Sequence, residues 1–367
     1  MHDTSTRIYV GSNKGAGELI VQDGGRVISS CSGTSLTVGD NSPHEDYTNY
    51  PSKLTVTGSN SVYSNLLGSI LLSTKKHSTA ELNVTDNGLL VHNGAYFFVG
   101  EAVGGNGLLN ISSGGVVDAR LTTQYMSIGR HGTGTVSVTG NGSKLLAPGE
   151  KNVILGYSAN TSQGTLIIEN DGVVEKSGTT GNLYVGYSTN TTDQLIVRDN
   201  GVLRWGGSGT VYVGFNKSQG LVSVESGGLV EVENGDFVVY SNSTLRIDGG
   251  RIQSVKSDLQ SHVVFNAVLW QGDANNTALM TASGEGRIRD AVLTVEKGAD
   301  FVYKPGDVYT LMTASPLHAT YNRFAYDGSV LQDGDIIDVG GTIFKVGYTA
   351  NTVTLTVRQT GTLIFVN

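Results

Sequence analysis

The chain has 367 residues and a formal net charge of −8, with 51 glycines but only 5 prolines. Hydrophobic residues make up 38% and charged residues 15%, which excludes a disordered linker, and glycine does not recur at every third position as in collagen. The acidic balance lacks the basic face of a nucleic-acid-binding protein, so we expect no nucleic acid partner.

A short alternating strand that ends in glycine recurs about every 28 residues, which is the length of one coil of a β-helix. In each copy we expect the flanking apolar residues to point inward and the middle residue to point outward. Ile70–Ser73 is a degenerate copy. The others are Ile8–Gly11, Leu36–Gly39, Phe97–Gly100, Met126–Gly129, Val153–Gly156, Leu183–Gly186 and Val211–Gly214.

Each unit continues with a second strand, a tight turn and a third strand, as in Glu18–Val27. The turn dipeptides consist of Gly, Asn and Asp, which tolerate positive φ, so we expect two successive left-handed residues at this corner. The structural turn residues are Gly25, Asn87, Gly88, Asn141, Gly142, Asp171, Gly172, Asn200, Gly201 and Gly228.

Three strands and three corners per unit predict a triangular coil. Residues 1–254 are therefore predicted to form a single-stranded, right-handed parallel β-helix (β-solenoid) of about nine coils, in an all-β chain.

The period breaks at about Val255, and we expect residues 255–367 to hold irregular last coils and an antiparallel β capping domain. A cap would cover the open edge of the solenoid and prevent end-to-end strand pairing. The predicted strands are His262–Trp270, Arg289–Tyr303, Val308–Ala314, Ile336–Val339, Thr342–Tyr348 and Thr352–Val357.

Candidate contact residues for a glycan or a protein are aromatic. Tyr157, Tyr187 and Phe215 follow the closing glycine of consecutive units, and Tyr184 and Tyr212 occupy the middle of consecutive strands. Stacked coils place such rings ~5 Å apart, which suits either a stiffening ladder or platforms for sugar rings. Two tryptophans either extend this face or belong to the core, namely Trp205 and Trp270.

Enzymatic motifs are missing from the sequence, so we assign no catalytic residue, no cofactor and no metal ligand. Glu169, Arg198 and Glu225 share one position in consecutive units and predict an alternating charge ladder on a solvated edge. Asp333, Asp335 and Asp338 are spaced closely enough for calcium, but turn chemistry explains them better.

Cys31 is the only cysteine, which excludes an intrachain disulfide and a cysteine-based zinc site. No apolar run reaches the ~18 residues of a transmembrane helix. Residues 1–4 lack the features of a signal peptide, so we expect an export signal to be absent or removed.

Two phrases, LYVGYSTNTTDQLIVRDNGVL and VYVGFNKSQGLVSVESGGLV, resemble the repeat of autotransporter (type V secretion) passengers and of bacterial surface proteins with PEP-CTERM sorting signals. The C-terminal run from Gly306 to Val357 is similar to the segment that often ends such arrays. The resemblance implies a secreted solenoid at the cell surface, used for display, adhesion or matrix building. No anchor helix follows Asn367, so a processed fragment or a borrowed repeat is expected.

The expected function is a non-enzymatic, secreted structural or adhesive module, whose partner is a surface glycan, a protein or copies of itself. Two alternatives stay open. One is a glycan-cleaving enzyme of the lyase or depolymerase kind, and the other is a phage virion fibre or decoration protein.

Overall fold

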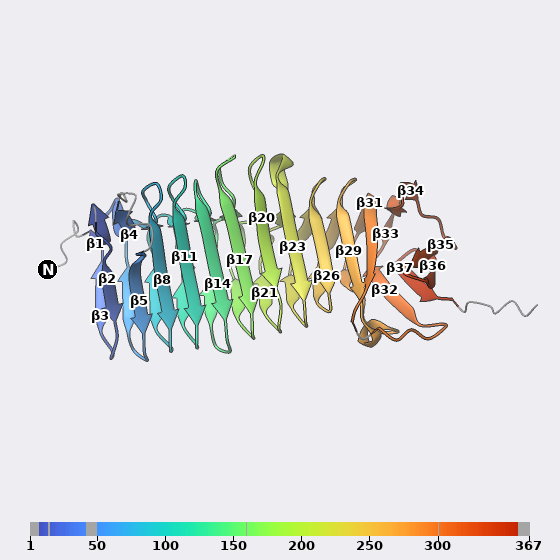
Figure 1. Cartoon of the computed structure of the whole chain (residues 1–367), viewed down its shortest axis with the longest axis horizontal. Coiled ribbons are helices and arrows are strands. Elements are labelled where there is room, and N and C mark those ends of the chain that lie inside the picture. Colours follow the sequence, from blue (N-terminus) through green and yellow to red (C-terminus); the bar gives the residue numbers. More distant parts are fainter. Residues whose placement is uncertain (1–6, 14, 42–49, 159, 300, 359–367) are drawn as a thin grey trace, which may run out of the picture.

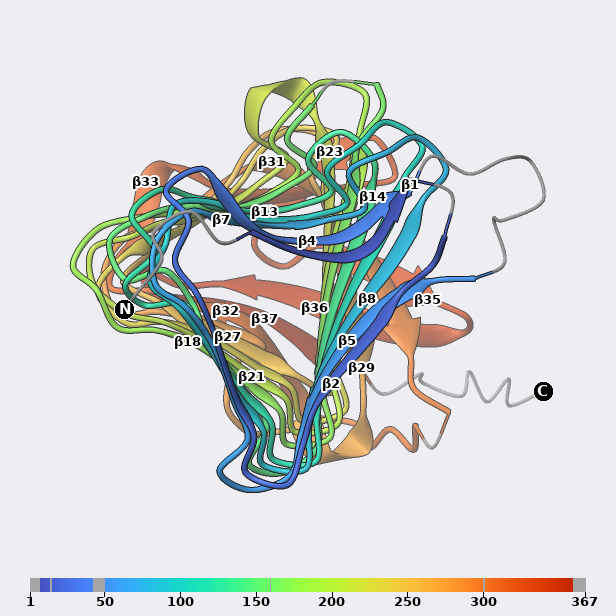
Figure 2. The ribbon, with the colours of Figure 1, turned by 90° about the vertical axis from the view of Figure 1, so that its left-hand side faces the viewer.

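The computed structural model describes residues 7–13, 15–41, 50–158, 160–299 and 301–358. The chain ends, on which the expectations about an export signal and an anchor rest, lie outside the described residues. The described part is an elongated stack of triangular coils with antiparallel strands at its C-terminal end (Figures 1 and 2). The all-β parallel solenoid predicted from the sequence is confirmed.

Three faces build the stack, and on each face a strand pairs in parallel with its counterpart in the next coil. The first face contains β1 (Ile8–Asn13), β4 (Thr34–Asn41), β7 (Ser69–Leu72), β10 (Phe97–Val99), β13 (Met126–Ile128), β16 (Val153–Leu155), β19 (Leu183–Val185), β22 (Val211–Val213), β25 (Asp236–Val239) and β28 (Lys256–Leu259).

The second face follows the first within each coil. It contains β2 (Glu18–Val21), β5 (Ser52–Thr57), β8 (Thr79–Thr85), β11 (Asn106–Ser112), β14 (Thr133–Thr139), β17 (Gln163–Glu169), β20 (Thr192–Val197), β23 (Gln219–Glu225), β26 (Thr244–Asp248) and β29 (Val264–Leu269). The long strand β31 (Gly286–Lys297) pairs with both β28 and β29 and so serves both faces.

The third face closes each coil. It contains β3 (Arg26–Ser29), β6 (Val62–Asn65), β9 (Leu89–His92), β12 (Val116–Asp118), β15 (Lys144–Leu146), β18 (Val173–Lys176), β21 (Val202–Trp205), β24 (Leu229–Val232), β27 (Arg251–Ser254), β30 (Met280–Ala282) and β32 (Val308–Thr313).

The solenoid has about 11 coils. Nine of them, built from β1 to β27, lie in the repeat region that ends at residue 254, where about nine were predicted. The others follow Val255, where β28, β29 and β30 continue the parallel stack although their sequences no longer repeat the phrase of the earlier units. Coil stacking needs only matching strand registers, so it extends beyond the part of the chain in which the residue pattern is regular.

The core is a column of inward-facing side chains that continues from coil to coil, as the alternating pattern predicts. On the second face one such row has no member more than 1% exposed, and burying each of these side chains contributes ~1.5–3 kcal/mol. The row consists of Leu54, Leu82, Leu109, Val136, Leu166, Leu195, Val222 and Leu245.

The turn between the second and third faces differs from the expected one. The left-handed pair lies one residue earlier than predicted, at Asp199 and Asn200 (φ 51° and 60°) rather than at Asn200 and Gly201. The amide of Gly201 closes the turn by donating to the carbonyl of Arg198 over 2.8 Å. Gly201 is required for a different reason, because a Cβ there would lie 2.2 Å from the carbonyl oxygen of Ile168 in the preceding coil.

The same close approach recurs at the equivalent glycines. A Cβ would come within 2.1 to 2.3 Å of a carbonyl oxygen of the preceding coil at Gly88, Gly115, Gly172 and Gly228. The Asn141-Gly142 turn is one residue longer, and its positive φ values fall on Gly140 and Gly142. The glycine excess therefore reflects tight coil stacking as well as backbone conformation.

An antiparallel region covers the last coil, as predicted. β32 pairs with β37 (Thr352–Val357), which pairs with β36 (Thr342–Tyr348), which in turn pairs with β35 (Ile336–Val339). Two further strands were not predicted, namely β33 (Leu317–Tyr326), which pairs in parallel with β31, and β34 (Ser329–Val330), which pairs with β33. We call residues 317–357 the cap.

Candidate functional site

A ladder of aromatic rings follows the corner between the first and second faces. The rings of Tyr125, Tyr157, Tyr187 and Phe215 stack in succession with centroid distances of 5.3, 5.7 and 5.6 Å and interplanar angles of 13°, 4° and 22°. Tyr240 continues this series at 5.7 Å from Phe215. We call these five residues the corner ladder.

The outward residues of neighbouring strands on the first face reinforce the corner ladder. Tyr184 stacks on Tyr212 at 5.2 Å, and Tyr184 also meets Tyr187 and Phe215 edge to face at 5.1 Å each. The structure therefore brings all five predicted contact residues, including Tyr157, into one cluster.

Four aromatic members of the cluster were missed by the sequence analysis, namely Tyr96, Phe98, Tyr125 and Tyr240. They reach the same corner from different positions in their units, so no single offset from the closing glycine identifies them.

The stacking decides which part of each ring is available to a partner. Inside the ladder each ring has a neighbour on both sides, so a ring such as Tyr187 presents its edge and hydroxyl group rather than a face. These side chains are half-buried, and burial raises the pKa of Tyr184 above its usual value. This geometry suits a stiffening ladder and leaves a flat platform for a sugar only at a ladder end.

At the N-terminal end of the cluster, a cation covers the aromatic face. The Arg130 guanidinium lies 4.3 Å from the centroid of Phe98 and pairs with Glu101 at 2.6 Å. Phe98 occupies a middle strand position and lies outside the core column, as predicted, yet it is only 3% exposed because Tyr96, Tyr125 and Arg130 cover it. Three further middle residues, Thr37, Ser127 and Ile154, are buried as well.

At the C-terminal end, the outward positions of the first face change from aromatic to charged. Tyr212 is in register with Val238, Val238 with Asp258, and Asp258 with Arg287. Beside this row a cavity of about 130 Å³ opens on the surface. Its lining consists of Asp236, Val238, Lys256, Ser257, Asp258, Glu285 and Arg287, and we call it the charged pocket.

The second face carries the predicted charge ladder in part. Arg198 pairs with Glu169 at 2.6 Å, as expected, whereas Glu225 accepts a hydrogen bond from the Ser223 hydroxyl at 2.6 Å.

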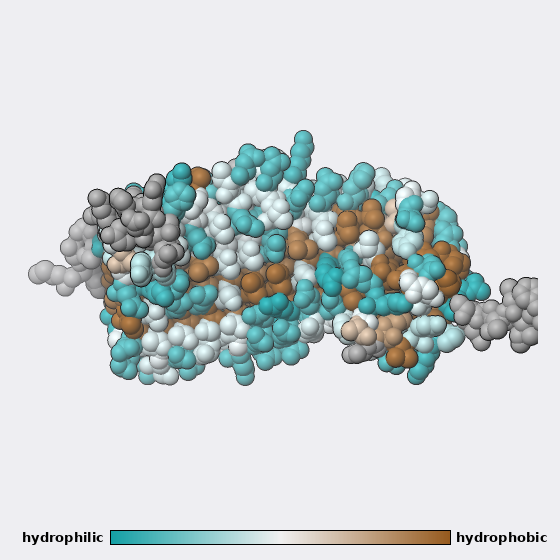
Figure 3. Space-filling model, in the orientation of Figure 1, coloured by the Kyte–Doolittle hydropathy of each residue, from teal (hydrophilic) through white to brown (hydrophobic). Residues whose placement is uncertain are grey.

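The second face also carries apolar residues. Figure 3 shows this face of the molecule, on which apolar residues gather in a band across the strands, between paler and hydrophilic borders.

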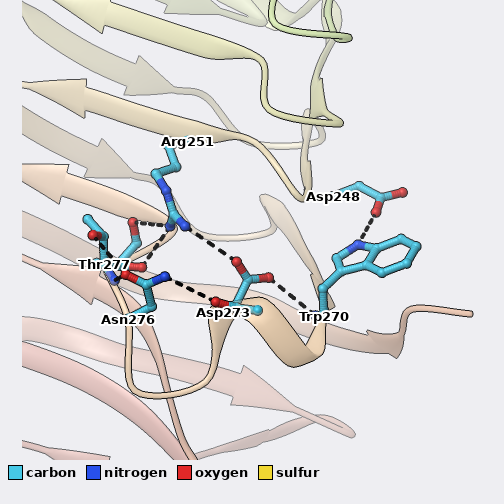
Figure 4. A network of polar contacts seen from close by, with 8 residues as sticks. Asp248, Arg251, Trp270, Asp273, Asn276 and Thr277 are labelled. Carbon is cyan, nitrogen blue, oxygen red and sulfur yellow. Dashed lines mark hydrogen bonds and ion pairs between the residues drawn. The ribbon is translucent and has the colours of Figure 1, made fainter. Parts of the chain in front are cut away.

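The two tryptophans lie in different places. Trp205 belongs to the core, and its indole nitrogen donates to the carbonyl of Gly181 over 3.2 Å. Trp270 donates to Asp248 over 2.7 Å, and the Asp273 carboxylate that follows accepts from its backbone amide (Figure 4).

Arg251 extends the polar network around Trp270. Its guanidinium lies 3.5 Å from Asp273 and donates to the carbonyl of Thr277 over 2.7 Å (Figure 4). The short helix η2 (Gln271–Asp273) is thereby held against the stack where the regular coils end. Neither tryptophan extends the aromatic cluster.

A buried carboxylic acid interrupts a row of small residues on the second face. Asp193 is in register with Gly164 and Gly220, is fully buried, and accepts a hydrogen bond from the Gly164 amide at 2.6 Å. Its second carboxylate oxygen has no hydrogen-bond partner. Burial raises the pKa of Asp193 to about 6.

The aspartates considered for calcium act as turn acceptors. Asp333, Asp335 and Asp338 accept hydrogen bonds from the backbone amides of Tyr348, Gln332 and Gly341, respectively. Over the described ranges, no group of three or more His, Cys, Asp or Glu residues is placed to hold a metal ion. Nor does the described part contain a helix long and apolar enough to cross a membrane.

No protein-family model and no curated protein matches this sequence. What is established is the β-solenoid fold, and the candidate site therefore rests on the arrangement of the chain's own residues.

Proposed function

We propose that this protein is a non-enzymatic structural or adhesive module that works outside the bacterial cell, as the resemblance to autotransporter passengers and PEP-CTERM surface proteins implies. The observation that carries the proposal is the unbroken stack of about 11 coils, reinforced along one corner by the aromatic cluster. In such a stack each coil contacts only its neighbours, so the chain forms a stiff spacer of defined length.

The burial and ion pairing of the carboxyl groups with raised pKa values support a protein that binds a polymer rather than one that cleaves it. A glycoside hydrolase needs two accessible carboxyl groups, one of which keeps its proton near neutral pH. Burial raises the pKa of Glu101, Asp193 and Asp273, but Glu101 and Asp273 are each paired with an arginine, and Asp193 is fully buried. None of the three is therefore an exposed, unpaired carboxyl group.

The outer surface supports a role in contact with other molecules. The aromatic cluster presents ring edges and hydroxyl groups along one corner, and the charged pocket follows at its end. A surface glycan, a protein or further copies of the chain are the partners that we propose.

Incubation with a panel of polysaccharides tests this proposal. We expect no release of reducing ends and no unsaturated uronates over a day, whether or not a polymer is retained by the protein. Catalytic release of either product would overturn the non-enzymatic proposal in favour of a glycan-cleaving enzyme.

A further inference from the structure

The corner ladder has an end at which a ring face lacks an aromatic neighbour. Tyr240 contacts Tyr212 and Phe215 at 6.1 and 5.7 Å, and no further ring continues the series beyond it within the described ranges. Tyr240 follows the pocket-lining residue Val238 by two positions, and β25 pairs with β28, which holds Asp258, so the charged pocket adjoins this end of the ladder.

Strand registry arranges the pocket residues as a small grid. Asp236 is in register with Lys256, Val238 with Asp258, and Asp258 with Arg287. Because alternate residues of a strand point to the same side, Asp236 and Val238 share one side of β25, as Lys256 and Asp258 do on β28. The grid therefore alternates in charge along the stack.

Part of this grid is already ordered by ion pairs. Asp258 binds Arg289 through two hydrogen bonds of 2.8 and 2.9 Å, and Glu285 pairs with Arg287 at 2.6 Å. In the described part of the chain, Asp236 and Lys256 have no ion pair and no side-chain hydrogen bond. The pocket thus offers one carboxylate and one ammonium group to a ligand, between side chains that are already held in place by ion pairs.

We propose that the charged pocket and Tyr240 form a subsite for a neutral polysaccharide chain. One sugar ring lies against Tyr240, and hydroxyl groups of the chain donate to Asp236 and accept from Lys256. This inference rests on the proposed adhesive function and adds the class of ligand.

The chemistry of the subsite favours a neutral saccharide. An aromatic face binds the apolar face of a sugar ring, while charged groups form the stronger hydrogen bonds to hydroxyls. The lining holds three anions, Asp236, Asp258 and Glu285, and two cations, Lys256 and Arg287. Arg289 pairs with Asp258 from outside the lining and supplies a third cation. Because these charges balance, the pocket holds no net charge that would attract a polyanion.

The test measures binding of the full chain to soluble galactomannan, xylan and mixed-linkage β-glucan, with alginate as the polyanionic arm, by affinity electrophoresis and calorimetry. The variants are Tyr240→Ala, Asp236→Ala and Lys256→Ala. The matched control is Tyr96→Ala, which removes a half-buried ring at the opposite end of the aromatic cluster. Circular dichroism and thermal unfolding establish that each variant is folded.

We expect at least one neutral polysaccharide to bind the wild type, and about tenfold weaker binding for each pocket variant. This loss corresponds to one charge-assisted hydrogen bond for Asp236→Ala and Lys256→Ala, and to one ring contact for Tyr240→Ala. The control should bind like the wild type. Unchanged binding in all three pocket variants would place the site elsewhere and overturn the inference, while leaving the adhesive function intact.

Two other outcomes would also overturn the inference. If no neutral polysaccharide binds, the ligand class is wrong, although a structural function still stands. If alginate alone binds and only Lys256→Ala weakens it, the pocket acts as a simple cationic patch. Release of reducing ends counts against the proposed function and not against the position of the subsite, so the two failures can be told apart.

Discussion

The coil stack and the cap are both β-structure, yet different contacts hold them. In the stack each position recurs from coil to coil, so small residues such as Gly201 and rings such as Tyr187 gain their importance from repeated neighbours. Where the cap meets the stack, antiparallel strands pack a few large side chains, and Phe344 of β36 lies against Tyr309 of β32 with the ring centroids 6.2 Å apart. Because its contacts repeat, the stack is sensitive to a poor fit at a single position. The cap acts as a whole, by covering the strand edges of the last coil.

Removing the cap strands should have the largest effect. Truncation after Gln332 deletes β35, β36 and β37, which leaves β32 unpaired on one side and uncovers core residues. We expect loss of the soluble monomer, because open strand edges associate. Size-exclusion chromatography with light scattering measures this, and a truncated chain that stays monomeric would contradict the capping role.

A methyl group at a stacking glycine should destabilise the coils locally. Gly201→Ala places a Cβ against the carbonyl of Ile168, and we expect a loss of about 3 kcal/mol in the stability of the neighbouring coils. Hydrogen exchange monitored by mass spectrometry measures the loss coil by coil. The matched control is Gly272→Ala, whose Cβ would meet nothing within 4 Å. Equal effects of the two substitutions would refute the role given to close stacking.

Neutralising the buried carboxyl should stabilise the stack at high pH. The pKa of Asp193 in the folded state is about 6, above its unfolded value. The protonated side chain therefore contributes folding stability that is fully present below about pH 4 and is lost as the pH rises through 6. We expect Asp193→Asn to stabilise the chain by up to about 3 kcal/mol at pH 8 and little at pH 4. Thermal unfolding at both pH values measures this difference, and Glu233→Gln serves as an exposed control. A stabilisation of equal size at pH 4 and pH 8 would contradict the prediction.

Loss of one ladder ring should matter more than loss of an exposed ring near the cap. Tyr187→Ala removes contacts with Tyr157, Phe215 and Tyr184, and we expect a cost of about 1–2 kcal/mol. Tyr303 is 40% exposed and touches one ring, that of Phe301, so Tyr303→Ala should cost less. Chemical unfolding of both variants provides the comparison, and the reverse order would disprove a stiffening role.

The smallest effect should come from the charge ladder. Arg198 pairs with Glu169 but is 41% exposed, so Arg198→Ala should cost only about 0.5 kcal/mol. The difference from the wild type should shrink at high salt, because exposed charges are screened. A cost that does not change with ionic strength would indicate a packing role for the arginine stem instead.

Sequence periodicity predicted the coils because their positions recur, and it predicted β35, β36 and β37 with the bounds that the structure has. It missed β28, which lacks the closing glycine of the earlier first-face strands, and β30, which is not preceded by the glycine-containing turn of the earlier units, although both strands keep the register of the stack. It also could not predict the burial of Phe98, which depends on rings that arrive from other units. Likewise, the charged pocket assembles residues of three coils whose spacing follows no motif.

The direction of the coil-to-coil pairing has a mechanical consequence. The strands lie across the long axis of the molecule, so the hydrogen bonds between coils run along that axis (Figure 1). Tension applied at a chain end therefore peels the outermost coil first, because that coil is paired with a neighbour on one side only. The molecule would give way in steps of one coil, and each step would release a stretch of extended chain, so a tether would lengthen gradually rather than fail all at once.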